Sequence, residues 1–228
     1  MNRFKELKNY GWIEHRMNDA TVNHIWDCIE SQGKSMKNSL VGQIDKSYFI
    51  EDIDHLLWNN LLVQCGDVYQ KTWGNPCILP IASKSDKDFI LYLEKMWVNY
   101  QNKHEYNPLH NHKGVYSFVV WMKIPTDYKE QQEQPNAKGS NGPQNSSFYI
   151  QYVDILGQFH TFNKEMNPED EGTMLFFPSA LVHGVNPFYN CDEPRISISG
   201  NLLLDPEIQY DSTPPQVVPV ATTPMKTL

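Results

Sequence analysis

Short apolar runs with a period of two dominate the chain from Met96 onward. A period of two places successive side chains on opposite faces of a strand, and Val, Ile, Tyr, Phe and Trp favour that conformation. Gly, Pro and Asn separate the runs and indicate turns. The pattern predicts a hairpin turn at Leu156 and Gly157 and strands over 97–102, 115–123, 148–155, 158–163, 173–177, 184–187 and 195–204.

The first part of the chain shows helical spacing instead. Between Ala20 and Ile29, apolar residues recur at i, i+3, i+4 and i+7, with Asp19 as the expected N-cap. A second helix is expected after the segment Glu51-Asp-Ile-Asp54, with one face formed by Ile53, Leu56, Leu57, Asn60 and Leu61. A third helix is predicted over Lys87–Lys95. Helices followed by many short strands predict a mainly β, α+β fold, with a helical N-terminal region (1–95) packed on a jelly-roll barrel (96–204).

Two segments differ from the predicted core. Residues 127–147 form a long, polar insertion with Pro and Gly, which is either a lid or a disordered loop. Residues 205–228 contain five prolines and are expected to form a mobile tail.

Composition and charge narrow the class of protein. A chain of 228 residues with 40% hydrophobic residues is expected to form one globular domain. Its net charge of −8 argues against a nucleic-acid partner. The N-terminus is too polar for a secretion signal and no apolar stretch is long enough to span a bilayer, so we expect a cytoplasmic protein, in a bacterial or phage-infected cell, with no membrane partner. The four cysteines lack a C-x-x-C pair and are expected to be buried free thiols: Cys28, Cys65, Cys77 and Cys191.

Three of the eight histidines carry candidate chemistry. His110 and His112 are two residues apart, so on an extended segment both imidazoles point to the same side. His183 follows an apolar run and precedes Gly184, at a strand end where a barrel presents ligands. These three are the predicted catalytic and metal-binding residues. The other five are expected to have no functional role: His15, His24, His55, His104 and His160.

Arg195 opens an alternating strand twelve residues after His183. In that alternation Arg195, Ser197 and Ser199 share one face, while Ile196 and Ile198 share the other and are expected to pack against the helices. A buried arginine needs a partner, and a ligand carboxylate matches the guanidinium fork. By strand parity, further candidates for the pocket wall are Tyr116, Trp121, Tyr149 and Gln151.

The order His110-x-His112, the segment Gly172–Ser179, His183 and Arg195-x-Ser197 resembles the 2-oxoglutarate/Fe(II)-dependent oxygenases. It is especially similar to little-characterised members encoded by marine phages. The resemblance implies a double-stranded β-helix over residues 95–204 and the use of Fe(II), 2-oxoglutarate and O2. It also implies that His110 and His183 bind iron, and that Arg195 and Ser197 bind the distal carboxylate of 2-oxoglutarate.

One position departs from the family pattern. The facial triad of these enzymes is His-x-Asp/Glu with a second histidine, and this chain has His112 where the acid is expected. Three explanations stay open: His112 binds iron, only two side chains and a water do, or a distant acid such as Asp154 or Glu171 reaches the metal. A three-histidine site carries one more positive charge than the triad, which alters the redox potential of the iron.

The resemblance implies hydroxylation of an unactivated C–H bond, with release of succinate and CO2. The alternative is a cupin-type three-histidine metal protein or a dioxygenase without 2-oxoglutarate, although the glutamate of the first cupin motif is missing. A non-enzymatic capsid-like or carbohydrate-binding jelly roll would leave the histidines and Arg195 unexplained. The sequence does not identify the substrate, a small molecule or a peptide, or the oligomeric state.

Overall fold

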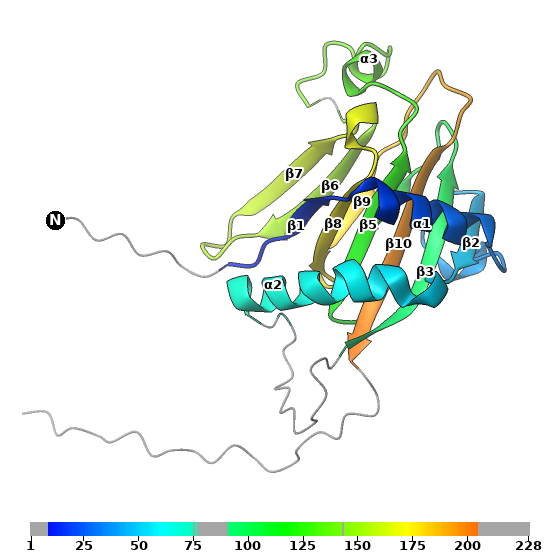
Figure 1. Ribbon diagram of the computed structural model, residues 1–228. Helices are drawn as coiled ribbons and strands as arrows, with labels where there is room; N and C mark the ends of the chain where they lie inside the picture. The colour runs from blue at the N-terminus through cyan, green and yellow to red at the C-terminus, as the bar shows by residue number, and fades with distance from the viewer. Residues whose placement is uncertain (1–8, 75, 77–90, 143, 205–228) are drawn as a thin grey trace, which may run out of the picture.

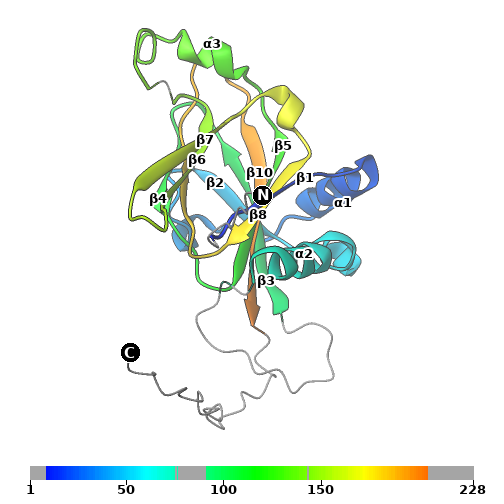
Figure 2. The same ribbon diagram turned by 90° about the vertical axis from the view of Figure 1, so that its left-hand side faces the viewer.

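In the computed structural model, two antiparallel sheets face each other and helices cover the outer side of the larger sheet (Figures 1 and 2). The structure describes residues 9–74, 76, 91–142 and 144–204. The six-stranded sheet has the order β1-β8-β5-β10-β3-β2, and the four-stranded sheet has the order β4-β9-β6-β7. This is the predicted jelly-roll arrangement in a mainly β protein with few helices.

Most predicted strands are present with small changes at their ends. Strand β10 occupies the predicted range, whereas β9 begins two residues earlier than expected and therefore contains His183. The strands are β1 (Ile13–Arg16), β2 (Lys46–Ile50), β3 (Leu91–Gln101), β4 (Asn107–His110), β5 (Tyr116–Lys123), β6 (Ser147–Val153), β7 (Phe159–Glu165), β8 (Thr173–Pro178), β9 (Val182–Val185) and β10 (Arg195–Leu204).

The predicted third helix is wrong over its described part, because β3 begins at Leu91. This segment pairs with the end of β10, from Leu91 opposite Leu204 to Lys95 opposite Asn201. Hydrogen bonds to a neighbouring strand therefore outweigh a local helical pattern. Residues 87–90 lie outside the described residues.

The first helix, α1 (Asp19–Glu30), agrees with the prediction except at its start. Asn18, not Asp19, is the N-cap, and its side chain accepts a hydrogen bond from the backbone N–H of Thr21. The buried face of α1 is formed by Ile25, Cys28 and Ile29. This face packs in the same core cluster as the outer side of the larger sheet.

The second helical segment is interrupted at its start, where Asp54 and His55 both have φ of +54°. The π-helical turn η3 (Trp58–Leu62) then leads into α2 (Val63–Trp73). Of the predicted apolar face, Leu57 and Leu61 are buried, as is the neighbouring Leu62, whereas Ile53 and Leu56 are exposed. The short helical turns elsewhere are η1 (Lys37–Ser39), η2 (Ile53–His55) and η4 (Pro168–Asp170).

The insertion at 127–147 is folded in its described residues, so the disordered-loop alternative is wrong there, and the lid alternative stays a prediction. Asp127 caps the short helix α3 (Tyr128–Gln132). The buried Gln131 side chain both donates to the Tyr189 carbonyl and accepts from the Tyr189 N–H. Asn145 donates to the carbonyl of Gln131. Buried amides satisfy the backbone here, which is why a polar sequence can be ordered.

Two separate cores lie on either side of the larger sheet. One lies under the helices and includes Ile25, Leu62, Val98 and Ile198, and the other lies between the two sheets and includes Trp121, Phe148 and Phe177. No helix among the described residues is long and apolar enough to cross a membrane. The proposed boundaries 1–95, 96–204 and 205–228 remain predictions, and the tail lies outside the described residues.

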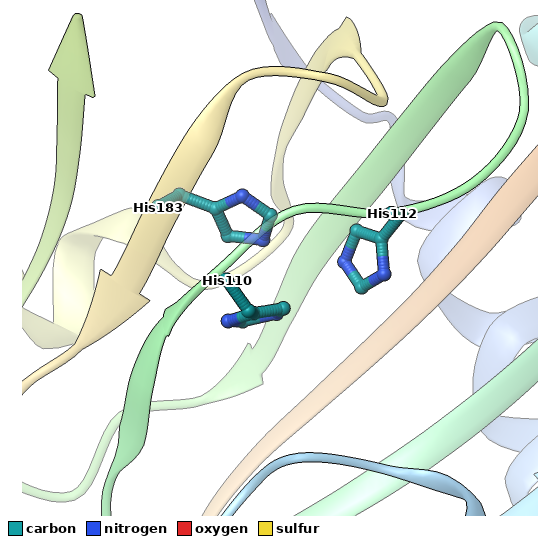
Figure 3. A group of neighbouring side chains, drawn as sticks. All are labelled: His110, His112 and His183. Atoms are coloured by element: carbon teal, nitrogen blue, oxygen red, sulfur yellow. The ribbon is translucent and has the colours of Figure 1, made fainter.

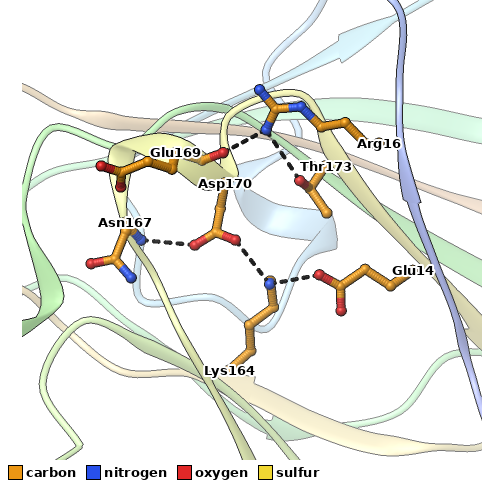
Figure 4. A network of polar contacts seen from close by, with 7 residues as sticks. All are labelled: Glu14, Arg16, Lys164, Asn167, Glu169, Asp170 and Thr173. Carbon is orange, nitrogen blue, oxygen red and sulfur yellow. Dashed lines mark hydrogen bonds and ion pairs between the residues drawn. The ribbon is translucent and has the colours of Figure 1, made fainter.

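A polar network joins the two sheets at the β1 edge (Figure 4). Lys164 of β7 donates to Glu14 of β1 at 2.8 Å and to Asp170 of η4 at 3.0 Å. Arg16 of β1 donates to the Glu169 carbonyl. The Lys164 side chain is only 11% exposed, so this ion pair is better shielded than a typical surface pair and helps hold the sandwich closed.

Candidate metal and anion site

A cavity of about 530 Å³ lies between the two sheets. The larger sheet contributes residues of β3, β5 and β10 to its wall, and the smaller sheet contributes residues of β4, β6 and β9. All five predicted site residues line this cavity: His110, His112, His183, Arg195 and Ser197. The cavity therefore brings together segments far apart in the sequence.

The three histidines form a compact cluster (Figure 3). His110 ends β4 and lies opposite His183 of β9, while His112 is in the loop that follows β4. Their ring centroids are 4.4 to 5.1 Å apart. One nitrogen of each ring lies within 4.8 Å of the others. Imidazole nitrogens at this spacing can coordinate a single transition-metal ion.

Backbone carbonyls set the tautomers of two of these rings. Nδ1 of His110 is 2.7 Å from the Pro108 carbonyl, and Nδ1 of His183 is 2.9 Å from the Leu181 carbonyl. A carbonyl oxygen only accepts, so each Nδ1 carries the proton and each Nε2 keeps its lone pair. This is the orientation in which outer-shell hydrogen bonds hold histidine ligands of a metal.

Burial keeps these histidines neutral. It lowers the pKa of His183 to about 3 and that of His112 to about 4, with a further lowering by the neighbouring His110. Burial also lowers the pKa of His110. Neutral imidazole is the metal-binding form, so the cluster is ready to bind a cation at neutral pH.

Arg195 is the most unusual charged residue of the described chain, because it is only 1% exposed and has no carboxylate partner there. Its guanidinium donates to Gln101 at 3.3 Å and to Ser146 at 2.6 Å, and lies over the Phe188 ring. Its Nε atom has no hydrogen-bond partner. Burial lowers its pKa to about 9, which still leaves it charged at neutral pH. A buried cation with an unused donor fits a carboxylate ligand.

The alternation of β10 sorts its side chains as expected. Arg195, Ser197 and Ser199 line the cavity, while Ile196 and Ile198 lie in the core under the helices. The neighbouring β3 adds Trp97, Asn99 and Gln101 to the wall. These residues and Ser146 were not anticipated, although amides that alternate with apolar residues in a buried strand are a detectable signal.

Asp154 and Glu171, the acids suggested as a third metal ligand, lie away from the histidine cluster. Asp154 binds His160 and the turn at Gly157, and Glu171 accepts from the backbone N–H of Ile124. Neither lines the cavity, where Glu94 is the only acid among the described lining residues. The described histidine cluster contains no carboxylate. Of the four residues suggested by parity, Trp121 lines the cavity and Tyr116, Tyr149 and Gln151 do not.

Comparisons with known proteins give a family match and a shared fold. Residues 95–201, just under half of the chain, match the family described as putative 2OG-Fe(II) oxygenases. The chain is similar to HygX from Streptomyces hygroscopicus, solved with nickel, 2-oxoglutarate and hygromycin B, at 11% identity and a TM-score of 0.50, covering 86% of this chain and 83% of HygX. It is also similar to a Pseudomonas putida prolyl-4-hydroxylase at 12% identity and a TM-score of 0.48, covering 86% of this chain and 94% of that one.

No curated protein gives a significant match. At such low identity the likeness to HygX shows a shared fold, and the expected similarity to marine phage members stays a prediction. The family match over residues 95–201 and the shared fold together support the 2OG-Fe(II) oxygenase superfamily and the predicted enzyme class of 2-oxoglutarate/Fe(II)-dependent dioxygenases.

Proposed function

We propose that this protein is a non-haem oxygenase that uses Fe(II), 2-oxoglutarate and O2 to hydroxylate a C–H bond of a small-molecule or peptide substrate. In this proposal His110, His112 and His183 hold the iron, and Arg195 with Ser197 binds the distal carboxylate of 2-oxoglutarate. The coproducts are succinate and CO2. The location in the cytoplasm and the absence of nucleic-acid and membrane partners stay predictions.

The main support for the proposal is the buried charge of Arg195, which has no carboxylate partner among the described residues. Its charge is buried in the wall of the cavity that also holds the histidines, and its described neighbours supply only neutral acceptors. Burying an unpaired charge costs several kcal/mol, so the fold keeps a cation that a dicarboxylate would neutralise. A metal protein without a carboxylate ligand has no need of it.

The histidine cluster would hold the metal that binds the keto-acid end of 2-oxoglutarate. Three neutral nitrogens suit Fe(II) and leave coordination positions for exogenous ligands. When bound, iron supplies the oxidative chemistry, for which the protein provides ligands and orientation. Carbonyl contacts hold His110 and His183 in the ligating tautomer, and Trp121 and Phe148 supply an apolar wall that limits water beside them.

The cavity is of a size that holds a small ligand. Its volume of about 530 Å³ lies within the range of small-ligand pockets, about 300–1,000 Å³. Lys95, Lys113 and Glu94 add charges to its lining. A substrate with polar groups is therefore compatible with this wall.

The proposal is tested by anaerobic titration of metal-free protein with Fe(II) and then 2-oxoglutarate. We expect the visible iron-to-keto-acid charge-transfer band in the natural sequence and in Arg16→Met, a matched control at an exposed arginine on β1. We expect no band at the same ligand concentration in Arg195→Met. Iron binding without a band in the natural sequence would favour the cupin-type alternative.

The same titration decides the role of His112. If His112 is a ligand, His112→Ala lowers iron affinity about tenfold or more, while His15→Ala, at an exposed position on β1, leaves it unchanged. Equal iron affinity in both variants would contradict the three-histidine site and leave His110 and His183 as the protein ligands.

A further inference from the structure

A second group of metal-binding side chains lies outside the cavity, on the helical side of the molecule. His24 and Cys28 are four residues apart on α1, so both face the same side of the helix. Asp52 precedes η2 and approaches them from a segment distant in sequence. The Cys28 residue is 0% exposed, and the side chains of His24 and Asp52 are 12% and 2% exposed.

Both contacts within this group use the same nitrogen. Nε2 of His24 is 3.0 Å from Oδ1 of Asp52 and 3.5 Å from Sγ of Cys28. A neutral ring nitrogen either carries one hydrogen or accepts one, so Nε2 cannot donate to Asp52 and accept from the Cys28 thiol at the same time. If Nε2 donates its hydrogen to Asp52, the Cys28 sulfur can be only a weak acceptor of that same hydrogen and cannot donate to His24.

A single metal ion could be coordinated by one atom from each of these three side chains. Tetrahedral zinc, with distances of about 2.0 Å to nitrogen and oxygen and about 2.3 Å to sulfur, places its ligand atoms about 3.3 to 3.6 Å apart. The two distances at Nε2 are close to this spacing, and all three donor atoms lie within 4.8 Å of one another. The ligand set of one imidazole, one thiolate and one carboxylate suits zinc.

The surroundings hold the carboxylate in place. Oδ1 of Asp52 accepts from the backbone N–H of Leu57 at 2.9 Å, and Oδ2 accepts from that of Trp58 at 2.8 Å. Burial raises the pKa of Cys28, the Ile53 N–H opposes this shift, and the charge of Asp52 adds to it. A divalent cation balances one thiolate and one carboxylate, which removes the cost of two buried negative charges.

We propose that His24, Cys28 and Asp52 form a three-ligand zinc-type site that links α1 to the segment leading into α2. A tetrahedral ion held by these three side chains would take a water as its fourth ligand. His24 also lines a second cavity, of about 430 Å³. The site is separate from the three-histidine cluster and does not depend on the proposed oxygenase function.

The test uses a His110→Ala/His183→Ala background, which removes the first cluster. After equilibration with zinc and dialysis, we expect about one zinc per chain by elemental analysis, and with Co²⁺ a near-ultraviolet thiolate-to-cobalt band. Both signals should be lost in that background with Cys28→Ser and kept with Cys65→Ser, a matched control at another buried cysteine. Absence of bound zinc in the background, or its retention with Cys28→Ser, would overturn the proposal.

A second measurement keeps the proposal testable if Cys28→Ser does not fold. In the background variant with Cys28 intact, zinc should raise the melting temperature and a chelator should reverse the rise. An unchanged melting temperature together with no cobalt–thiolate band would overturn the site without reference to the substitution.

Discussion

Arg195 and Ile198, on opposite faces of β10, are equally buried but chemically opposite. Arg195, on the cavity face, is 1% exposed, and Ile198, on the face under the helices, is 0% exposed. Ile198 packs among apolar neighbours, whereas the Nε atom of Arg195 has no partner. Burial alone therefore does not separate a structural residue from a functional one, and an unsatisfied polar group in a cavity does.

Substitutions on the two faces of β10 are expected to have different effects. Substitutions on the cavity face should change ligand binding with little loss of stability, because they remove groups that the folded protein does not fully satisfy. Substitutions on the core face should lower stability and leave the ligand set intact.

The largest effect is expected at Arg195. Arg195→Met keeps much of the side-chain volume and removes the charge, so 2-oxoglutarate affinity in the presence of Fe(II) should fall about 100-fold or more, as expected for breaking a buried ion pair. Anaerobic calorimetry measures this, with Arg16→Met as the control. A loss of less than threefold would contradict the role of the cavity face.

On the opposite face, Ile198→Ala should lower the free energy of unfolding by about 3 kcal/mol, because it leaves a cavity in the core under the helices. Denaturant unfolding measures the loss. The folded variant should still show the iron-to-keto-acid band. If the band disappears while the protein stays folded, the two faces are not independent.

The pH dependence of the metal-free protein provides a third test. Unfolding returns the His183 and His112 pKa values from about 3 and 4 toward 6.5, so the unfolded chain binds more protons between these limits. Stability should therefore fall as the pH drops below about 6.5, by on the order of 2 kcal/mol per histidine at pH 5. His183→Ala should lose much of this dependence, and an unchanged pH profile would contradict the account.

The smallest effect is expected at Ser197. Ser197→Ala removes one neutral hydrogen-bonding group, so 2-oxoglutarate affinity should fall about two- to tenfold. Ser199→Ala, the next residue on the same face, is the matched comparison. A larger loss for Ser199→Ala would move the carboxylate site along the strand.

The sequence predicted the features that depend on local alternation. The bounds of β10 and the sorting of its side chains agree with the prediction, because a regular strand fixes both. Strands β1, β2 and β4 were missed, since their patterns are weak and they form by pairing with β8, β3 and β9. The segment from Leu91 was predicted as a helix for the same reason: its partner, β10, is distant in sequence.

In the site, too, local features were predictable and contacts between distant segments were not. The spacing of His110 and His112 predicted that their rings point to the same side. The strand-end position of His183 and the alternation around Arg195 made them site candidates, and the resemblance gave them their roles. The partners of Arg195 could not be predicted, because Ser146 belongs to the polar insertion and Gln101 to a neighbouring strand. His24 was expected to have no role, and its proximity to Asp52 exists only in the folded chain.

The central claim is that 2-oxoglutarate lies between the three histidines and the polar face of β10. The most direct measurement is an anaerobic crystal structure with Mn(II), as a redox-stable substitute for Fe(II), and 2-oxoglutarate. The account predicts the metal on the histidine cluster and the distal carboxylate on the Arg195 guanidinium. A metal at the histidines with Arg195 free of any carboxylate, in crystals saturated with 2-oxoglutarate, would contradict it.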